Sequence, residues 1–374
     1  MRQTFDCLIV GGGAAGIGMG CVLQDLNVDF SILERGEIGT SFLLWPKEMR
    51  MITPSFTSNA FGMLDLNAIA LQTSPAYTLG TEHPSGEEYA RYLQAVADYR
   101  KLPVQTGIDV TAVRPVKDGF ELETSRGTWF SRFVVWAAGE FQYPKMDGFP
   151  GAEYCVHSSL VREWSELEGE ERVVIGGFES GADAAFHLSR LGKKVTVIDR
   201  VDRWTNKRSS DPSVELSPFT KDRLREIARG RICWLAGYEV YKVKVSVKEG
   251  YLVYCKNTSG VRRRIVTRHP PILATGFKGS LELVRHLFEQ GSRGEILLNE
   301  RDESTVTPGL FVSGPGVTHE NQKFCFICKF RQRFAIIAET IAERLGRDTA
   351  VLEEYRKRGM MLCDLSCCEE DCKC

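Results

Sequence analysis

Two glycine-rich turns, each framed by the same succession of segments, constrain this chain more than any other feature. The first reads Gly11-Gly12-Gly13-Ala14-Ala15-Gly16 and the second Gly176-Gly177-Phe178-Glu179-Ser180-Gly181. Each follows an apolar run, opens an alanine-rich helical stretch and leads to a β-branched run. That run ends in an acid, Glu34 or Asp199, 23 residues after the first glycine. Strand, helix and strand therefore occur twice, as in a dinucleotide-binding βαβ unit.

The residue types at both turns suit a bound pyrophosphate. Glycines let the backbone turn tightly and approach the ligand, a helix N-terminus offers N–H groups, and the acid can accept a ribose hydroxyl. Phe178 stands where the first turn has Gly13. We therefore expect the second nucleotide to bind shifted, weakly, or only after Phe178 moves. Two dinucleotides in one chain indicate electron transfer.

Composition indicates a globular protein of two domains. The chain has 374 residues, 26% charged and 43% apolar, which is enough for two cores. Lys and Arg (48) balance Asp and Glu (49), so we expect neither nucleic acid nor a membrane as partner. We expect the short run 262–264 of three arginines in a solvated hairpin turn. No apolar run approaches the ~18 residues of a membrane span, and a cytoplasmic location is expected.

The pattern predicts an α/β fold of two Rossmann-like domains, each with an inserted antiparallel meander. A capping-box spacing at Ser85 predicts a helix to about Arg100. Strands at 111–116, 120–124 and from 129 form the first meander, and 240–247 with 251–255 begin the second. A short strand within 307–314 and one long helix follow. We assign 1–148 and 278–362 to an FAD domain, 149–277 to an NAD(P) domain, and 363–374 to a cysteine-rich tail.

These motifs resemble the two-dinucleotide-domain flavoproteins, most closely flavin-containing monooxygenases and cation-efflux-associated flavoproteins. The resemblance rests on both turns, on Ala274-Thr275-Gly276-Phe277 and on the segment 307–314. It implies FAD at the first turn and NADPH at the second. The residues expected to bind these cofactors are Gly11, Gly13, Ala14, Ala15, Gly16, Glu34, Arg35, Trp45, Ala138, Gly139, Gly176, Glu179, Ser180, Gly181, Asp199, Arg200, Thr275, Gly276 and Gly314.

The chain departs from this family in ways that leave the reaction open. The monooxygenase signature is stretched, with five residues between Phe149-Pro150-Gly151 and His157. His157 is a candidate catalytic residue with a plain alternative as a turn or capping residue. Pro315 follows Gly314 where many relatives carry an Asp toward the ribityl chain. Asp199 suits NADH, whereas the nearby Arg200 and Arg203 suit the 2′-phosphate of NADPH.

Twelve cysteines without an export signal argue for thiol chemistry or metal binding rather than a disulfide framework. Cys325 and Cys328 form a Cys-x-x-Cys pair at the start of the last long helix, where the helix dipole is expected to lower a thiol pKa. Alternatively, Cys325 and Cys328 are small residues of the hydrophobic core. A core position is the expected one for Cys7, Cys21, Cys155, Cys233 and Cys255. The tail carries five cysteines, namely Cys363, Cys367, Cys368, Cys372 and Cys374.

Three hypotheses follow. The first is an FAD-dependent NAD(P)H oxidoreductase that reduces a disulfide or thiol-bound substrate through Cys325, Cys328, Cys367 and Cys368. The second is an NADPH-dependent flavin monooxygenase. The third is a flavoprotein with structural FAD whose five tail cysteines hold a soft metal, because thiolates are the preferred ligands of such ions. A small-molecule or thiol/disulfide substrate is the expected partner, and a homodimer would let a tail reach a second flavin.

Overall fold

The computed structural model describes residues 3–57, 64–204, 213–292, 294–319 and 322–365. These residues form two compact units. Unit 1 comprises the described parts of 3–43, 54–142 and 279–365, and unit 2 comprises those of 44–53 and 143–278. The segment 44–53, which the sequence analysis placed in the first domain, groups with unit 2. The assignment of FAD to one unit and NAD(P) to the other stays a prediction.

Unit 1 is built on a seven-stranded sheet in the order β3-β2-β1-β6-β5-β4, with β15 beside the end of β6. Strands β1, β2, β3, β6 and β15 run parallel, whereas β4, β5 and β6 form the predicted antiparallel meander. The carboxyl ends of β1, β6 and β15 therefore meet at one edge. The strands are β1 (Gln3–Val10), β2 (Phe30–Leu33), β3 (Val104–Gln105), β4 (Val110–Val116), β5 (Gly119–Thr124), β6 (Gly127–Trp136) and β15 (Leu310–Val312), with a separate pair β16 (Thr318–His319) and β17 (Gln322–Lys323).

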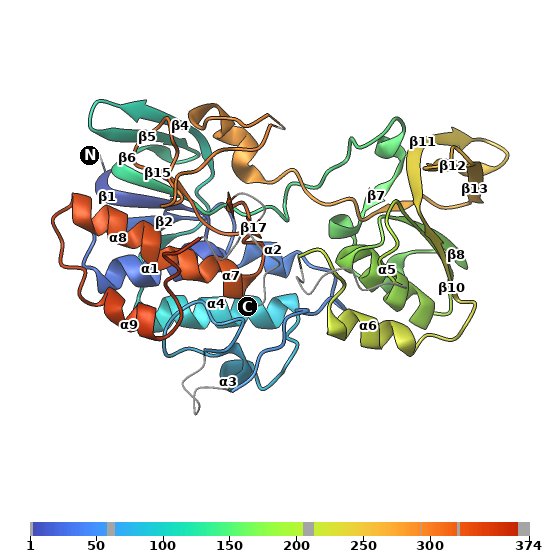
Figure 1. Cartoon of the computed structure of the whole chain (residues 1–374), viewed down its shortest axis with the longest axis horizontal. Coiled ribbons are helices and arrows are strands. Elements are labelled where there is room, and N and C mark those ends of the chain that lie inside the picture. The colour runs from blue at the N-terminus through green and yellow to red at the C-terminus, as the bar shows by residue number, and fades with distance from the viewer. Residues whose placement is uncertain (1–2, 58–63, 205–212, 293, 320–321, 366–374) are drawn as a thin grey trace. The chain divides into compact units, whose positions relative to one another are not determined.

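Three helices of unit 1, α1, α4 and α8, pack together (Figure 1). The predicted capping box is present, since the Ser85 hydroxyl accepts from the Glu88 N–H and the Glu88 carboxylate accepts from the Ser85 N–H. The predicted long last helix is instead broken. A turn of 3-10 helix over Arg331–Arg333 separates two helices, and both arginine side chains there are buried. The helices are α1 (Ala14–Asp25), α2 (Thr40–Leu43), α3 (Pro75–Leu79), α4 (Gly86–Arg100), α7 (Ile327–Phe330), α8 (Phe334–Arg344) and α9 (Leu352–Lys357).

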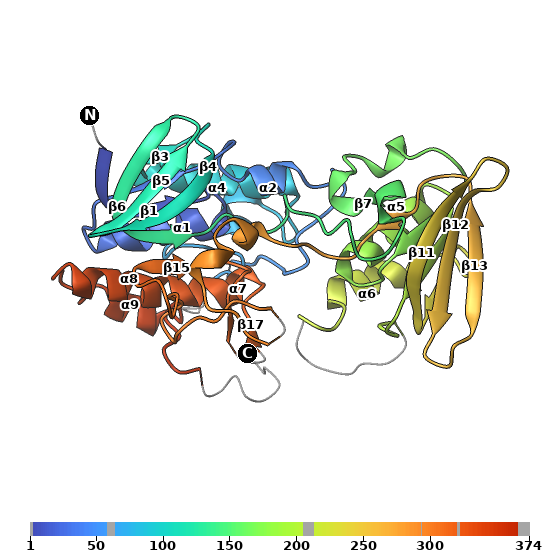
Figure 2. The same ribbon diagram turned by 90° about the horizontal axis from the view of Figure 1, so that it is seen from above.

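Unit 2 contains a five-stranded parallel sheet in the order β10-β9-β8-β14-β7 and a separate three-stranded antiparallel layer, β11-β12-β13 (Figure 2). The run 262–264 lies in the edge strand β13, so the prediction of a hairpin turn there is wrong. The elements are β7 (Val156–His157), β8 (Glu171–Ile175), α5 (Glu179–Arg190), β9 (Lys194–Asp199), α6 (Pro218–Arg225), β10 (Ile232–Ala236), β11 (Tyr238–Ser246), β12 (Gly250–Asn257), β13 (Arg262–Thr267) and β14 (Ile272–Leu273).

The predicted α/β class with two βαβ units is confirmed. In unit 2, one core cluster lies between the parallel sheet and the β11–β13 layer, and a second joins that sheet to α5. Among the described residues, no helix is both long enough and apolar enough to span a membrane.

Candidate functional site

The first glycine turn connects β1 to α1, and two of its glycines are required by the fold itself. Gly11 has φ +111°, and a Cβ there would lie 2.5 Å from the Ala137 carbonyl oxygen. At Gly16 a Cβ would lie 1.8 Å from the Gly11 carbonyl oxygen, so α1 can approach β1 this closely only without a side chain. These are the tight-turn and helix-packing roles of a dinucleotide fingerprint.

Gly13 is different, because nothing in the protein requires a glycine at this position. Its φ of −86° and ψ of −167° suit any residue, and apart from its two chain neighbours no atom of the described residues lies within 4 Å of an added Cβ. The N-terminus of α1 begins at the next residues, Ala14 and Ala15, both buried. The open space therefore lies over a helix N-terminus and fits the close approach of a pyrophosphate, as FAD would require.

Glu34 ends β2 beside this turn and is held by two backbone groups. One carboxylate oxygen accepts from the Gly12 N–H at 2.6 Å, and the other from the Gly36 N–H at 2.7 Å. Each carboxylate oxygen can accept a further hydrogen bond. The carboxylate is thus fixed in place and can still receive a ribose hydroxyl. Arg35, also predicted to bind the cofactor, donates to the Gln142 side chain at 2.5 Å.

The same edge of the sheet gathers the other predicted FAD residues of unit 1. Ala138 and Gly139 follow β6, and Gly314, with φ +101°, follows β15 close to Ala15. Ser280 holds this edge, since its N–H donates to the Gly139 carbonyl at 3.0 Å and its hydroxyl accepts from the Trp136 indole at 3.0 Å.

Sequence reasoning missed Glu140, which directly follows Gly139 at this edge. Burial raises the pKa of its carboxyl, and the positive charge of Lys323 opposes that rise. Its position immediately after the Ala-Ala-Gly segment is the sequence feature that could have identified Glu140 as a residue of this site. A carboxyl group that holds its proton more tightly than usual thus lies next to the predicted flavin side of the fold.

The second glycine turn repeats this geometry in unit 2. Gly176 has φ +97° and packs against the Ala274 carbonyl, and a Cβ at Gly181 would lie 2.0 Å from the Gly176 carbonyl oxygen. Asp199 accepts from the Gly177 N–H at 2.6 Å and from the Val201 N–H at 2.8 Å. The two turns are therefore equivalent in backbone and in their acid.

Other predicted residues of the second turn have partners inside unit 2. Glu179 accepts from the Ser217 N–H and the Thr220 hydroxyl, both at 2.5 Å, and burial raises its pKa. Its carboxylate thus joins α5 to the start of α6. Ser180 lies in the first turn of α5, and Arg200 is exposed beside Asp199.

Thr275, Gly276 and Trp45 are also tied to parts of unit 2. The Thr275 hydroxyl donates to the Lys145 carbonyl at 3.2 Å, and the Gly276 carbonyl accepts from the Lys145 N–H at 3.0 Å. Trp45 lies in the segment 44–53, which is bonded to residues 162–164 of the same unit. The grouping of Trp45 with unit 2 was not expected for a residue assigned to FAD.

His157 is buried, and both of its ring nitrogens have partners. Nδ1 accepts from the Ser159 N–H at 3.2 Å and lies 2.9 Å from the Ser159 hydroxyl, and Nε2 lies 3.1 Å from the Gly276 carbonyl. The side chain caps the 3-10 helix Ser158–Leu160. Burial lowers the pKa of the imidazole. This geometry favours the capping role over the catalytic role.

The Cys-x-x-Cys pair lies at the start of α7, as predicted, but the expected thiol activation is wrong for Cys328. Burial raises the pKa of Cys328 and outweighs the opposing effects of Arg331 and Lys329. Cys325 is exposed. Of the five residues expected in the core, Cys7, Cys21, Cys155 and Cys255 are buried, whereas Cys233 is exposed on the edge strand β10.

The structure describes only the base of the cysteine tail. Cys363 is exposed and its sulfur lies 3.9 Å from the Arg356 guanidinium. Cys367, Cys368, Cys372 and Cys374 lie outside the described residues. Within the described part of the chain, no group of three or more His, Cys, Asp or Glu side chains could hold a metal ion.

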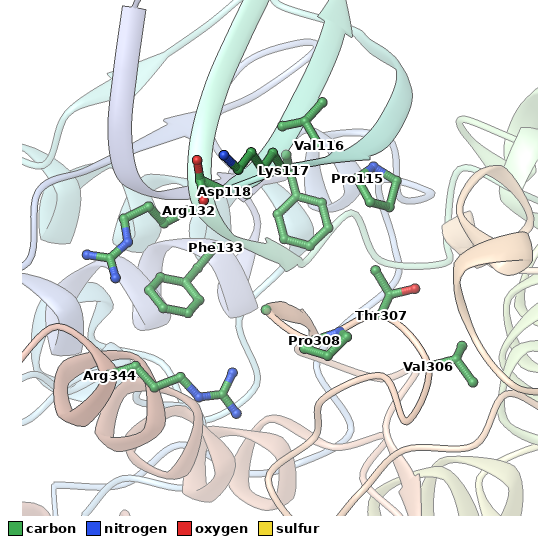
Figure 3. A pocket seen from close by; sticks show the side chains of 13 residues that line it. Pro115, Val116, Lys117, Asp118, Arg132, Phe133, Val306, Thr307, Pro308 and Arg344 are labelled. Carbon is green, nitrogen blue, oxygen red and sulfur yellow. The ribbon is translucent and has the colours of Figure 1, made fainter.

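A cavity of about 450 Å³ in unit 1 is lined by the β4–β5 turn, the middle of β6 and the segment just before β15 (Figure 3). Arg132, Phe133, Pro308 and Arg344 contribute to its lining. The glycine turn instead adjoins the carboxyl ends of the strands, and the Arg344 guanidinium is paired with Glu303. This cavity is therefore separate from the candidate cofactor site.

Comparisons with known proteins agree with this architecture. Bacilliredoxin reductase Bdr of Bacillus subtilis is 24% identical over 341 residues, which cover 90% of this chain and 97% of that protein. An oxidoreductase named CzcO of Bacillus velezensis is 29% identical over 219 residues, 55% of this chain. The match spans 59% of that CzcO protein, and 53% of a CzcO-like protein of Geobacillus kaustophilus.

Solved structures show the same fold. The bacillithiol disulfide reductase Bdr from Bacillus cereus superposes with a TM-score of 0.72 at 21% identity, covering 91% of this chain and 100% of that chain. A flavin-containing monooxygenase from Stenotrophomonas maltophilia gives 0.68 at 15% identity, covering 92% and 100%. The sequence pattern of one family matches residues 8–314, which include both glycine turns. The chain belongs to the pyridine nucleotide-disulphide oxidoreductase family.

Proposed function

We propose that this protein is an FAD-dependent NAD(P)H oxidoreductase that reduces a disulfide or a thiol-bound substrate. The observation that carries the proposal is the pair of equivalent glycine turns, each with an acid fixed by backbone N–H groups. The predicted cofactors agree with an ornithine N-hydroxylase from Kutzneria of the same fold, whose solved structure contains reduced FAD and NADP⁺. Bound FAD would supply the capacity to accept a hydride from the nicotinamide and pass two electrons onward.

In this proposal the residues of unit 1 hold FAD. Gly13 admits the pyrophosphate to the N-terminus of α1, and Glu34 accepts a ribose hydroxyl. The edge of the sheet at Gly139 and Gly314 contacts the flavin end of the FAD molecule. The second turn holds the pyridine nucleotide through Gly176, Ser180 and Gly181, with the diphosphate at the N-terminus of α5.

NADPH is the proposed nucleotide because of the surroundings of Asp199. Both carboxylate oxygens accept backbone N–H groups, and the Arg203 guanidinium lies 3.5 Å from the same carboxylate. Arg203 thus offsets the negative charge that would repel a 2′-phosphate. Arg200 adds a second cation at the end of β9.

The thiol route is favoured by the place where the tail begins. The Leu362 N–H donates to the Gln332 carbonyl at 3.0 Å, and the Leu362 carbonyl accepts from Arg333 at 2.6 Å. The Gln332 side chain in turn donates to the Cys328 carbonyl at 2.8 Å. The base of the tail is therefore fixed one helical turn from Cys328. Five residues lead from Leu362 to Cys367, a reach of about 17 Å when extended.

We propose that Cys325 exchanges with the tail thiols. Cys325 is exposed, so its thiolate can attack a disulfide formed by two tail cysteines, and the S–S bond breaks with one tail thiolate as the leaving group; Cys328, with its raised pKa, is the poorer thiolate. The balanced reaction is NADPH + H⁺ + disulfide → NADP⁺ + two thiols. The NADPH hydride supplies both electrons that cleave the S–S bond. The cytoplasm, where thiols are kept reduced, is the proposed location.

The test mixes FAD-loaded protein with NADPH or NADH without oxygen and follows the flavin absorbance, and then adds air or a disulfide. Bleaching that a disulfide reverses faster than air supports the proposal. Faster recovery in air would favour a flavin monooxygenase, a class with the same fold. Absence of bleaching with both nucleotides would overturn the oxidoreductase assignment and favour soft-metal binding by the tail.

Cysteine variants separate the relay from flavin reduction. Changing Cys367 and Cys368 to Ser, or Cys325 to Ser, should abolish disulfide reduction and leave bleaching by NADPH unchanged. Cys233→Ser is the matched control, because it is an exposed thiol of unit 2 outside the proposed route. Full disulfide reductase activity in the first two variants would exclude the cysteine relay.

A further inference from the structure

The two glycine turns share a backbone but differ in what covers them. Phe178, at the N-cap of α5, has φ −81° and ψ −162°, close to the values of −86° and −167° at Gly13. Its Cβ therefore points in the direction that is open at Gly13. The Phe178 ring is held by Arg203, whose guanidinium carbon lies 4.8 Å from the ring centroid.

A second difference lies five residues after each acid, at Gly39 and Trp204. In unit 1 the Gly39 backbone N–H donates to the Gly12 carbonyl at 3.0 Å. In unit 2 the corresponding carbonyl, that of Gly177, accepts instead from the Trp204 indole Nε1–H at 3.1 Å. The same carbonyl is thus satisfied by backbone in one unit and by a large aromatic side chain in the other.

The Trp204 ring lies directly on the second turn. A Cβ built at Gly177 would be 2.2 Å from its Cζ2 atom and 3.2 Å from the Asp199 Cβ. The ring therefore fills the corner between the glycine turn and the acid, where the adenosine half of a dinucleotide lies in this kind of fold. At Gly12, in contrast, the three atoms nearest to an added Cβ all belong to the Glu34 side chain.

A cavity beside the Trp204 ring provides space into which the ring can move. The ring packs against Trp234, with ring centroids 4.2 Å apart and the ring planes tilted by 38°. The two rings line this cavity of about 230 Å³ together with Leu216, Lys221, Leu224 and Arg225. An indole that leaves the Gly177 carbonyl can thus move into this cavity and remain in contact with Trp234 and the aliphatic side chains that line it.

We propose that Trp204 and Phe178 close the pyridine-nucleotide site in the nucleotide-free protein, and that the nucleotide binds by displacing Trp204 from the Gly177 carbonyl. This inference rests on the proposed assignment of the second turn to NAD(P)H. The apparent affinity is then the intrinsic affinity reduced by the fraction of molecules in which Trp204 has moved away. Loss of one hydrogen bond of about 0.5–1.5 kcal/mol corresponds to a factor of roughly 2 to 12.

The experiment measures binding of NADP⁺ to the oxidised, FAD-loaded full chain by calorimetry, with tryptophan fluorescence recorded in parallel. Trp204→Phe keeps a ring but lacks the indole donor, and should bind NADP⁺ about 2- to 12-fold more tightly. Phe178→Gly should also bind more tightly. The fluorescence change on binding should persist in Trp129→Phe, a matched control in unit 1, and disappear in Trp204→Phe.

The outcomes separate the inference from the proposed function. Equal affinity in the wild type, Trp204→Phe and Phe178→Gly, with the fluorescence change intact in Trp204→Phe, would overturn the closure by Trp204 and leave the oxidoreductase in place. Failure of every variant to bind NADP⁺ and NAD⁺, with FAD content and circular dichroism unchanged, would overturn both. Tighter binding in both variants would support the closed site.

Discussion

Replacing Gly13 with alanine should weaken FAD binding while leaving the FAD-free protein almost as stable as before. An alanine fits the φ and ψ of Gly13, and among the residues that the structure describes its Cβ meets no atom within 4 Å beyond its chain neighbours. Alanine restricts the unfolded chain more than glycine does, which raises the free energy of unfolding by about 0.4–1 kcal/mol. Alanine is also a poorer N-cap residue than glycine, which lowers the free energy of unfolding by a similar amount. The free energy of unfolding of the FAD-free protein should therefore change by less than about 1 kcal/mol.

The effect on FAD is much larger, because the added methyl group fills the space in which the pyrophosphate approaches the N-terminus of α1. Loss of one hydrogen bond to a charged phosphate costs about 1.5–3 kcal/mol, which raises the Kd roughly 10- to 150-fold. The assay titrates FAD into FAD-free protein and follows quenching of flavin fluorescence. Urea unfolding of the same samples measures stability.

Two other glycines serve as controls. Gly148→Ala is the neutral control, because a Cβ there also meets none of the described residues within 4 Å and the glycine lies in unit 2. Gly16→Ala should destabilise the FAD-free protein itself by at least about 1–3 kcal/mol, since its Cβ would lie 1.8 Å from the Gly11 carbonyl oxygen. Wild-type FAD affinity in Gly13→Ala would refute the placement of the pyrophosphate at this turn.

Three further predictions test other parts of the structure. Arg203→Ala should reduce the preference for NADPH over NADH by about tenfold, because a charge-assisted contact to the 2′-phosphate is lost. Equal changes in the Kd values of NADPH and NADH would exclude this role of Arg203. Arg190→Ala is the control. His157→Gln should reduce the acid sensitivity of folding. Burial lowers the pKa of His157 below 6.5, so the folded state favours the neutral imidazole, and the stability that depends on it is lost as the pH falls below 6.5. If the unfolding free energies of both proteins, measured in urea, fell by the same amount between pH 8 and 5, this prediction would be contradicted. Ser85→Ala should cost about 1 kcal/mol of unfolding free energy through loss of the α4 cap; an unchanged urea midpoint would show that the cap contributes nothing.

The sequence predicted local features well where backbone geometry and residue type are tightly linked. Gly11 and Gly16 had to be glycine for steric reasons that any βαβ turn shares, and the Ser85 box specifies a helix start by its own side chain. Tertiary contacts were harder to predict. The break in the last helix depends on the burial of Arg331 and Arg333, whose partners lie far away in the chain. Cys233 follows strand periodicity but belongs to an edge strand, so its exposure depends on the sheet order.

The internal repeat shows most clearly what a motif leaves undetermined. Phe178 departs visibly from the fingerprint, and sequence reasoning identified it as an obstacle. The Trp204 contact gave no such signal, because the residue five positions after an acid has no fixed role in the motif. Only the geometry of the Gly12 and Gly177 carbonyls makes the two positions comparable, one satisfied by the Gly39 backbone and the other by an indole. Two turns with the same backbone can therefore differ in how readily they admit a ligand, and that difference is set by side chains outside the motif.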